Sequence, residues 1–171
     1  MRRHIVGTLV LGFAALGAGS ATAQVRFGAN LSWGDDSDLG LGARLNFGLG
    51  DMARNQPIEG LVTFDYFFPG ESSPGFDVTY WTITANAIYR FTERTAAVAP
   101  YAGGGVMLGR SSTDPLSPGM GGASSSKVGL HAVGGLRFKT EGTILPFAEA
   151  RFELKDGAQF VLSGGVYFGQ P

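Results

Sequence analysis

The sequence predicts an all-β protein, an eight-stranded antiparallel β-barrel whose strands follow one another as an up-and-down meander. Two observations predict this class. After residue 24, eight segments alternate apolar with polar residues, and turn-forming clusters separate them, which is the pattern of strands with one buried face. No stretch of this region keeps a helical period. The 28 glycines are spread through the chain rather than confined to linkers, and glycine inside strand-like runs indicates close backbone approach or tight curvature.

The first 23 residues have the form of a secretory signal peptide. Arg2, Arg3 and His4 precede an apolar run over residues 5–16, and small residues follow up to Ala21-Thr22-Ala23. A basic start, a short apolar core and an A-x-A site are the parts of such a signal. The run is about a dozen residues long, shorter than the ~20 residues of a membrane-spanning helix. We expect cleavage after Ala23, so that residues 1–23 are the signal peptide and residues 24–171 the barrel domain.

The first four segments each set an apolar face against a polar one. Residues 25–33 alternate Val, Phe, Ala, Leu and Trp with Arg, Gly, Asn and Ser. Residues 39–49 alternate Leu, Ala and Phe with Gly, Arg and Asn. Residues 58–68 set Ile, Val, Phe and Tyr against Glu, Thr and Asp, and residues 81–91 set Trp, Ile, Ala, Tyr and Phe against Thr, Asn and Arg. Each segment therefore reads as one strand.

The second half of the chain repeats the scheme. Residues 102–109 set Ala, Val and Leu against Gly, and residues 127–139 set Val, Leu, Ala and Phe against Lys, Gly, His and Arg. Residues 148–155 set Ala, Phe and Leu against Glu, Arg and Lys, and residues 159–168 set Phe, Leu and Val against Gln, Ser and Gly. The segments keep phase for about nine to eleven residues, the length a tilted strand needs to cross a membrane. The exceptions, apolar residues on the polar side, are Leu61, Phe67, Met107 and Val133.

The connections fall into two sets. In a barrel with an even number of strands and both ends on the periplasmic side, the odd-to-even links face outward; here they are about residues 34–38, 69–78, 110–126 and 156–157. The periplasmic turns are then about residues 50–57, 92–98 and 140–143. Residues 110–126 are rich in Ser, Gly and Pro and carry little charge, which predicts a flexible surface loop.

Alternation by itself does not say which face is buried. In a soluble, lipocalin-like barrel the apolar face would fill the interior, and we keep that arrangement as an alternative. The membrane arrangement is favoured because the polar face is rich in Gly, Ser, Thr and Asn, which suits the filled interior of a narrow barrel. Aromatic residues of the apolar face also gather near the strand ends, as in the girdles at the two membrane interfaces. One predicted girdle is Trp33, Tyr66, Phe68 and Trp81, and the other is Phe27, Phe47, Tyr89, Phe91, Phe138 and Phe168.

Nine charged side chains then point into the barrel. An unpaired charge is costly in such an interior, and the basic and acidic members are nearly balanced, so we expect ion pairs that stabilise the barrel. The predicted interior charges are Arg26, Arg44, Glu59, Asp65, Arg90, Arg137, Glu149, Arg151 and Glu153.

Residues 24–168 resemble the small outer-membrane β-barrel proteins, the class of the outer membrane protein A transmembrane domain and of outer membrane protein X. The stretches that carry the resemblance are Gly/aromatic strand patterns at 100–106, 134–138, 146–152 and 162–168. The resemblance implies a bacterial outer-membrane location, contact with outer-membrane lipids and insertion by the barrel assembly machinery. Phe168 corresponds to the terminal aromatic residue that this machinery reads, although Gly169, Gln170 and Pro171 follow it.

The chain offers little sign of chemistry. His131 is the one histidine after the signal, and no motif joins it to Ser163 or Glu149 as a catalytic group would require; we expect a hydrogen-bonded packing residue and no enzyme. The acidic run 35–38 lacks the spacing of a calcium site, so we expect no metal and no cofactor. The chain contains no cysteine, and without Arg2 and Arg3 its 13 basic residues become 11 against 14 acidic, a net charge of −3. That balance does not support nucleic-acid binding.

Three functions remain open from the sequence. The first is a non-enzymatic structural or surface-interaction barrel, with an extracellular partner contacting the loop at residues 110–126. The second is a narrow porin-like channel or a conduit for small hydrophobic solutes. The third is the soluble, lipocalin-like ligand-binding barrel.

Overall fold

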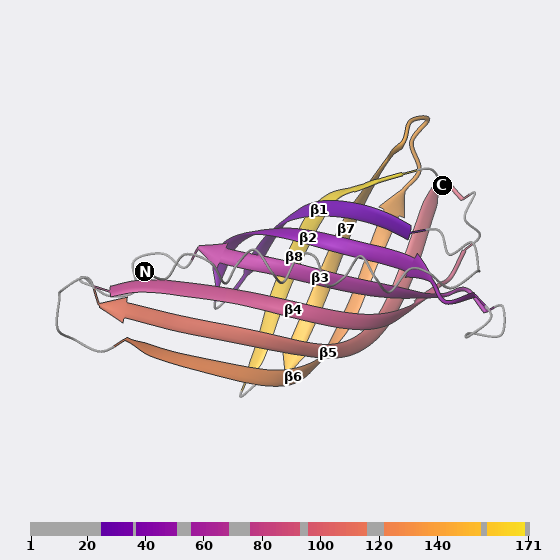
Figure 1. Cartoon of the computed structure of the whole chain (residues 1–171). Coiled ribbons are helices and arrows are strands. Elements are labelled where there is room, and N and C mark those ends of the chain that lie inside the picture. Colours follow the sequence, from indigo (N-terminus) through magenta and orange to yellow (C-terminus); the bar gives the residue numbers. More distant parts are fainter. Residues whose placement is uncertain are drawn as a thin grey trace.

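The chain forms a closed antiparallel β-barrel in a computed structural model that describes residues 25–35, 37–50, 56–68, 76–92, 96–115, 122–154 and 157–169. Each strand pairs with the next along the chain, and the last pairs with the first, as Figure 1 shows. The strands are β1 (Val25–Gly34), β2 (Asp38–Gly48), β3 (Ile58–Phe68), β4 (Phe76–Arg90), β5 (Val98–Pro115), β6 (Ala123–Phe138), β7 (Ile144–Leu154) and β8 (Ala158–Phe168). The predicted fold class and meander order are confirmed. The predicted signal peptide lies outside the described residues.

No helix in the described ranges is long and apolar enough to cross a membrane.

The two faces of the barrel wall have opposite polarity. Along β1, Arg26 and Asn30 are 6% and 4% exposed, whereas Phe27 and Leu31 are 65% and 55% exposed. Because successive side chains of a strand point to opposite faces, this alternation places polar residues inside and apolar residues outside. A lipocalin-like barrel requires the reverse, so the soluble alternative is wrong. An outer surface this apolar is stable only in lipid.

Three strands are longer than the others. β4, β5 and β6 contain 15, 18 and 16 residues, whereas the other strands contain 10 or 11. Figure 1 shows the three reaching past the rest of the wall at the end where β3 and β5 finish. We call this end of the barrel the extended end. The opposite end, where β1 begins and β8 finishes, is the terminal end.

The predicted loop at residues 110–126 is wrong over most of its length. β5 continues to Pro115 and β6 begins at Ala123, so the segments on both sides of the link form a paired hairpin. The link predicted at 69–78 is also shorter, because β4 begins at Phe76. The polar composition was misleading because hydroxyl side chains pair well across antiparallel strands, and outside the lipid they need no apolar face.

Several glycines allow a close approach between neighbouring chains. At Gly105, an added Cβ would overlap the carbonyl oxygen of Ala85 on β4. At Gly60 the neighbour is a side chain, because the Phe47 ring of β2 lies over that position. Gly105 thus marks a close approach of two backbones, and Gly60 marks a close approach of a ring to a backbone, as the sequence predicts.

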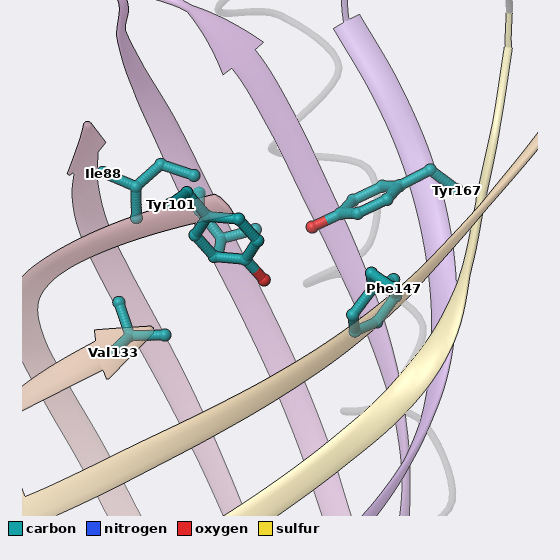
Figure 2. Packing of buried hydrophobic residues seen from close by; sticks show 6 residues of the cluster. Ile88, Tyr101, Val133, Phe147 and Tyr167 are labelled. Carbon is teal, nitrogen blue, oxygen red and sulfur yellow. The ribbon is translucent and has the colours of Figure 1, made fainter. Parts of the chain in front are cut away.

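An apolar cluster packs inside the barrel among the polar residues. Leu61, Ile88, Tyr101, Val133, Phe147 and Tyr167 are each at most 4% exposed. Figure 2 shows five of these side chains projecting inward from different strands. Leu61 and Val133, together with Phe67 and Met107, are the apolar exceptions noted in the sequence, and all four are buried inside. They fill space that polar side chains leave open.

We predict that Ala150→Arg destabilises the barrel in membranes. Ala150 lies on the outward face of β7, paired with Gly134 and Leu162. A cation there should lower the free energy of unfolding by roughly 2–4 kcal/mol because it enters the hydrocarbon. Urea titrations in phospholipid vesicles, followed by tryptophan fluorescence, measure this change. Ser124→Arg on the exposed part of β6 is the control, with an expected change below about 0.5 kcal/mol; equal effects of the two variants would contradict the lipid-facing assignment.

Candidate functional site

The barrel interior holds all nine charged side chains that the sequence places there. Eight are buried, and Arg90 is half-buried near the end of β4. They come from six of the eight strands, because the even or odd residues of each strand point inward together. The contacts between them define three clusters along the barrel, described below from the middle to each end.

The middle cluster is built around Arg44 and Glu149. Two nitrogens of Arg44 donate to the two carboxylate oxygens of Glu149 at 3.1 and 3.2 Å. Tyr101 donates its hydroxyl to the same carboxylate at 2.6 Å. The Arg44 guanidinium lies 4.0 Å above the centre of the Phe147 ring. A two-pronged pair of this kind is strong and sets both side chains in one orientation.

The second cluster lies toward the extended end, around Asp65. Arg151 donates to one oxygen of Asp65 at 2.6 Å, and Asn30 donates to the other at 2.7 Å. Ser32 donates to that second oxygen at 3.1 Å and shares a 2.8 Å hydrogen bond with Ser163 of β8. Glu153 lies 4.0 Å from Arg151. Residues of β1, β3, β7 and β8 are thereby tied together across the interior.

The third cluster lies at the terminal end, around Glu59. Arg90 donates to one oxygen of Glu59 at 2.7 Å, and Arg137 donates to the other at 2.6 Å. Arg90 also donates to the backbone oxygen of Thr92 at 2.9 Å. The Arg137 guanidinium lies 4.7 Å from the centre of the Tyr101 ring. One carboxylate thus accepts from two guanidinium groups.

Together these clusters fill the interior with bonded side chains. Glu59, Asp65 and Glu149 each accept hydrogen bonds from two or more side chains. A buried charge requires such partners, because separation from a partner leaves it uncompensated at low dielectric. The arrangement can hold the wall rigid and can obstruct flow through it.

The three residues considered for catalysis are not joined by hydrogen bonds in the part of the chain that the structure describes. His131 is buried on β6 opposite Glu153, whereas Ser163 pairs with Glu149 between β7 and β8 and is engaged with Ser32. Neither ring nitrogen of His131 has a hydrogen-bond partner among the described protein groups. The expectation of a hydrogen-bonded packing histidine is therefore only half met: His131 is packed inside the barrel without such a bond.

The acidic run 35–38 acts as a turn where it is described. Asp35 accepts a hydrogen bond from the backbone nitrogen of Phe160 at 3.0 Å, and Asp38 has a φ of 57° at the start of β2. Asp36 lies outside the described residues. Among the residues that the structure describes, no three His, Cys, Asp or Glu side chains are grouped closely enough to hold a metal ion.

The ten predicted girdle residues belong to the outward face. At the terminal end Phe27 pairs directly with Phe168, and at the extended end Tyr66 pairs with Trp81. Tyr66 also contacts Phe68, with ring centres 5.1 Å apart. Phe152 and Phe160 pair near the β7–β8 turn and are 47% and 40% exposed, whereas Phe64, at 42% exposed, lies further from the end of β3. The alignment of the two groups with membrane interfaces stays a prediction.

Several interior residues were missed from the sequence. Tyr101, Phe147, Tyr167 and Ile88 line the interior although they are apolar or aromatic. Their position in the alternation was the available signal, because each continues the inward parity of its strand. The apolar residue types favoured the outward face, whereas the position of each residue in the alternation of its strand correctly indicated the inward face.

Comparison with known proteins shows which solved structures share this fold. No family model and no curated protein matches the chain by sequence. Among solved structures, the N-terminal β-barrel domain of OprF from Pseudomonas aeruginosa is similar, with a TM-score of 0.65, 14% identity, and coverage of 84% of this chain and 95% of that one. Neisserial surface protein A is similar with a TM-score of 0.60 and 20% identity, over 85% of this chain and 95% of that one. A major outer membrane protein from Thermus thermophilus is similar with a TM-score of 0.59 and 12% identity, over 84% of this chain and 98% of that one.

These likenesses establish a shared fold, that of the small outer-membrane barrels which the sequence resembled. The apolar exterior requires a surrounding membrane, and the fold is one that outer-membrane proteins use. Both observations support the bacterial outer-membrane location predicted from the sequence.

We predict that Arg44→Met destabilises the barrel strongly because it leaves Glu149 buried without its cation. The expected loss in the free energy of unfolding is about 3–5 kcal/mol, and the double variant Arg44→Met with Glu149→Leu should recover much of it. Urea titrations in vesicles measure both. Arg110→Met removes an exposed arginine of β5 and serves as the control; an equal loss in that variant would show that the Arg44–Glu149 pair has no special role.

Proposed function

We propose that this chain is a non-enzymatic outer-membrane protein that contacts another protein through the extended end of its barrel. The observation that carries the proposal is the three-stranded sheet formed by β4, β5 and β6 beyond the rest of the wall, together with the free edge of β6. The odd-to-even links lie at this end, which topology favours as the outer side of the membrane.

The extended sheet is regular. The last pair between β3 and β4 is Phe67 with Tyr80, yet β4 and β5 stay paired out to Phe76 and Pro115. β5 and β6 stay paired from Arg110 with Ser126 to Thr113 with Ala123 (see Figure 1). Paired strands hold their shape, so this end presents an ordered surface.

The edge of β6 offers main-chain hydrogen-bonding groups. β6 and β7 begin to pair at Leu130 with Leu154, so among the described residues the 123–129 segment has strand partners on the β5 side only. Residues 123–128 are exposed and residue 129 is half-buried. An unpaired edge can accept an added strand, in which backbone groups supply the affinity and side-chain contacts supply the selection.

The chemistry of this sheet favours a protein partner. Residues 76–80, 110–115 and 123–127 contain two basic and two acidic residues, and most of the others are Ser or Thr in β5 and β6. This near-neutral, hydroxyl-rich surface lacks the clustered charge that a polyanion would need. An extended peptide segment, bound through backbone groups and hydroxyls, suits it better.

The interior does not favour the channel. The three clusters span the barrel from Glu59 to Asp65, and most of the side chains between them are less than 5% exposed. An eight-stranded barrel is just wide enough for its own side chains. The ion pairs and the apolar cluster supply those side chains.

We predict that removal of the extended hairpin abolishes partner binding and leaves the barrel folded. Replacement of residues 111–125 by Asn-Gly joins Arg110 to its pairing partner Ser126 through a two-residue turn that antiparallel strands accept. Cells displaying either form are tested for adhesion to immobilised serum and extracellular-matrix proteins. The intact chain should adhere to at least one of them and the shortened chain to none.

A finer variant separates the edge from the hairpin as a whole. Ser124→Pro and Ser125→Pro each remove one backbone N–H, and since successive amides of a strand alternate in direction, one of the two faces the free edge. That variant should lose adhesion while Ser124→Thr and Ser125→Thr keep it. Adhesion that survives the shortened hairpin and both proline variants would refute the proposed surface.

We predict that the purified barrel shows no discrete conductance steps in planar lipid bilayers. The bonded interior leaves no continuous water path for ions. The recordings use the refolded full-length barrel. Discrete openings of the unaltered barrel would assign the narrow-channel function instead.

A further inference from the structure

We propose an oxyanion-binding site, for a phosphate or carboxylate group, inside the mouth of the barrel at its terminal end. Arg137 and Lys139 are its central ligands, and Arg26 and Arg90 complete its wall. The site lies at the opposite end of the barrel from the β6 edge, so it does not depend on the function proposed above.

A small cavity marks the place. It has a volume of about 30 Å³, and four of the seven residues that line it are the cations just named. The other three are Ala96, Ala99 and Leu145. A second cavity of about 10 Å³ shares Arg26, Lys139 and Leu145 and is bordered by Thr140 and Thr143. Since a water needs ~10–15 Å³ measured in this way, the first cavity has room for roughly two waters or for the oxygens of one small anionic group.

The described lining of the cavity carries charge of one sign. None of its seven described residues is acidic. Glu59, behind the lining, already accepts from both Arg90 and Arg137. Glu141 in the neighbouring turn is exposed and does not line the cavity. The cations of this described lining, with the two partnerless nitrogens of Arg137 among them, favour an anion at this place.

Arg137 is oriented for such a ligand. Its Nη1 donates to Glu59 at 2.6 Å, and its guanidinium lies 4.7 and 5.3 Å from the ring centres of Tyr101 and Tyr167. These contacts fix the side chain, which is 3% exposed. Its Nε and Nη2 are buried and have no acceptor among the described protein groups. These two nitrogens form one edge of the guanidinium, the geometry that binds two oxygens of a phosphate or carboxylate at once.

Lys139 adds an adaptable charge at the rim. Its backbone nitrogen donates to the carbonyl oxygen of Ala97 at 2.8 Å, which continues the pairing of β5 with β6 beyond Val98 and Phe138. Its side chain is exposed, so it can reach toward an anion held by Arg137. A fixed guanidinium inside and a mobile ammonium outside thus make a site that an oxyanion enters from the solvent.

The test is a calorimetric titration of inorganic phosphate into the full barrel, refolded in phosphatidylcholine vesicles at low ionic strength, where surface charges are least screened. We expect saturable binding of one phosphate per barrel. Lys139→Gln should weaken it about tenfold, the loss of one charge-assisted hydrogen bond. Arg137→Lys, which keeps the charge and removes the two-nitrogen edge, should weaken it as well. Retention of the heat-modifiable band on gels confirms that each variant is folded.

Lys127→Gln is the matched control, because it removes the same charge from the extended end and should leave phosphate binding unchanged. Sodium acetate in place of phosphate tests a carboxylate ligand. Vesicles that contain phosphatidylglycerol, without added phosphate, test the lipid headgroup as the source: competition with later phosphate binding would identify it. The absence of saturable binding in all three arms, or an equal loss in Lys127→Gln and Lys139→Gln, would overturn the proposal.

Discussion

The pairing of β8 with β1 is the constraint on which the rest of this structure depends. In hydrocarbon an unpaired backbone N–H or C=O costs several kcal/mol, so a sheet can cross a membrane only when it has no open edge. Eight pairs in register, from Phe27 with Phe168 to Gly34 with Val161, close the circle. Closure then divides every strand into an inward and an outward half, since side chains alternate.

The interior follows from that division. Inward positions lie in a space too narrow for bulk water, so the charges that point there must find partners across the barrel. Arg44 reaches Glu149 and Arg151 reaches Asp65 from different strands. These bonds fix the rotation of each side chain, and the rings of Tyr101, Phe147 and Tyr167 fill the space between the polar groups. The ion pairs and rings that stabilise the barrel are therefore the same groups that fill its interior.

The two ends are free of the lipid constraint, and there the structure departs from a plain cylinder. At the extended end β6 runs seven residues beyond its pairing with β7, which an edge inside the bilayer would not permit. At the terminal end Arg90 and Arg137 share the carboxylate of Glu59, and water beyond the mouth can screen charges placed there. The proposed partner surface and the proposed anion site each lie where the barrel leaves the membrane.

The strand count, the meander, the inward or outward direction of most side chains and the nine interior charges could all be predicted from the amino-acid sequence. These properties depend on a period of two residues, which is local and visible in a single chain. Which charges meet could not be predicted, since Arg44 and Glu149 are 105 residues apart and their contact depends on closure and register. The length of β5 and β6 also required the three-dimensional structure, because a polar composition suits a loop and a paired strand equally well. The same holds for the inward direction of Tyr101, Phe147 and Tyr167, where residue type opposed parity and the space left between the ion pairs determined the outcome.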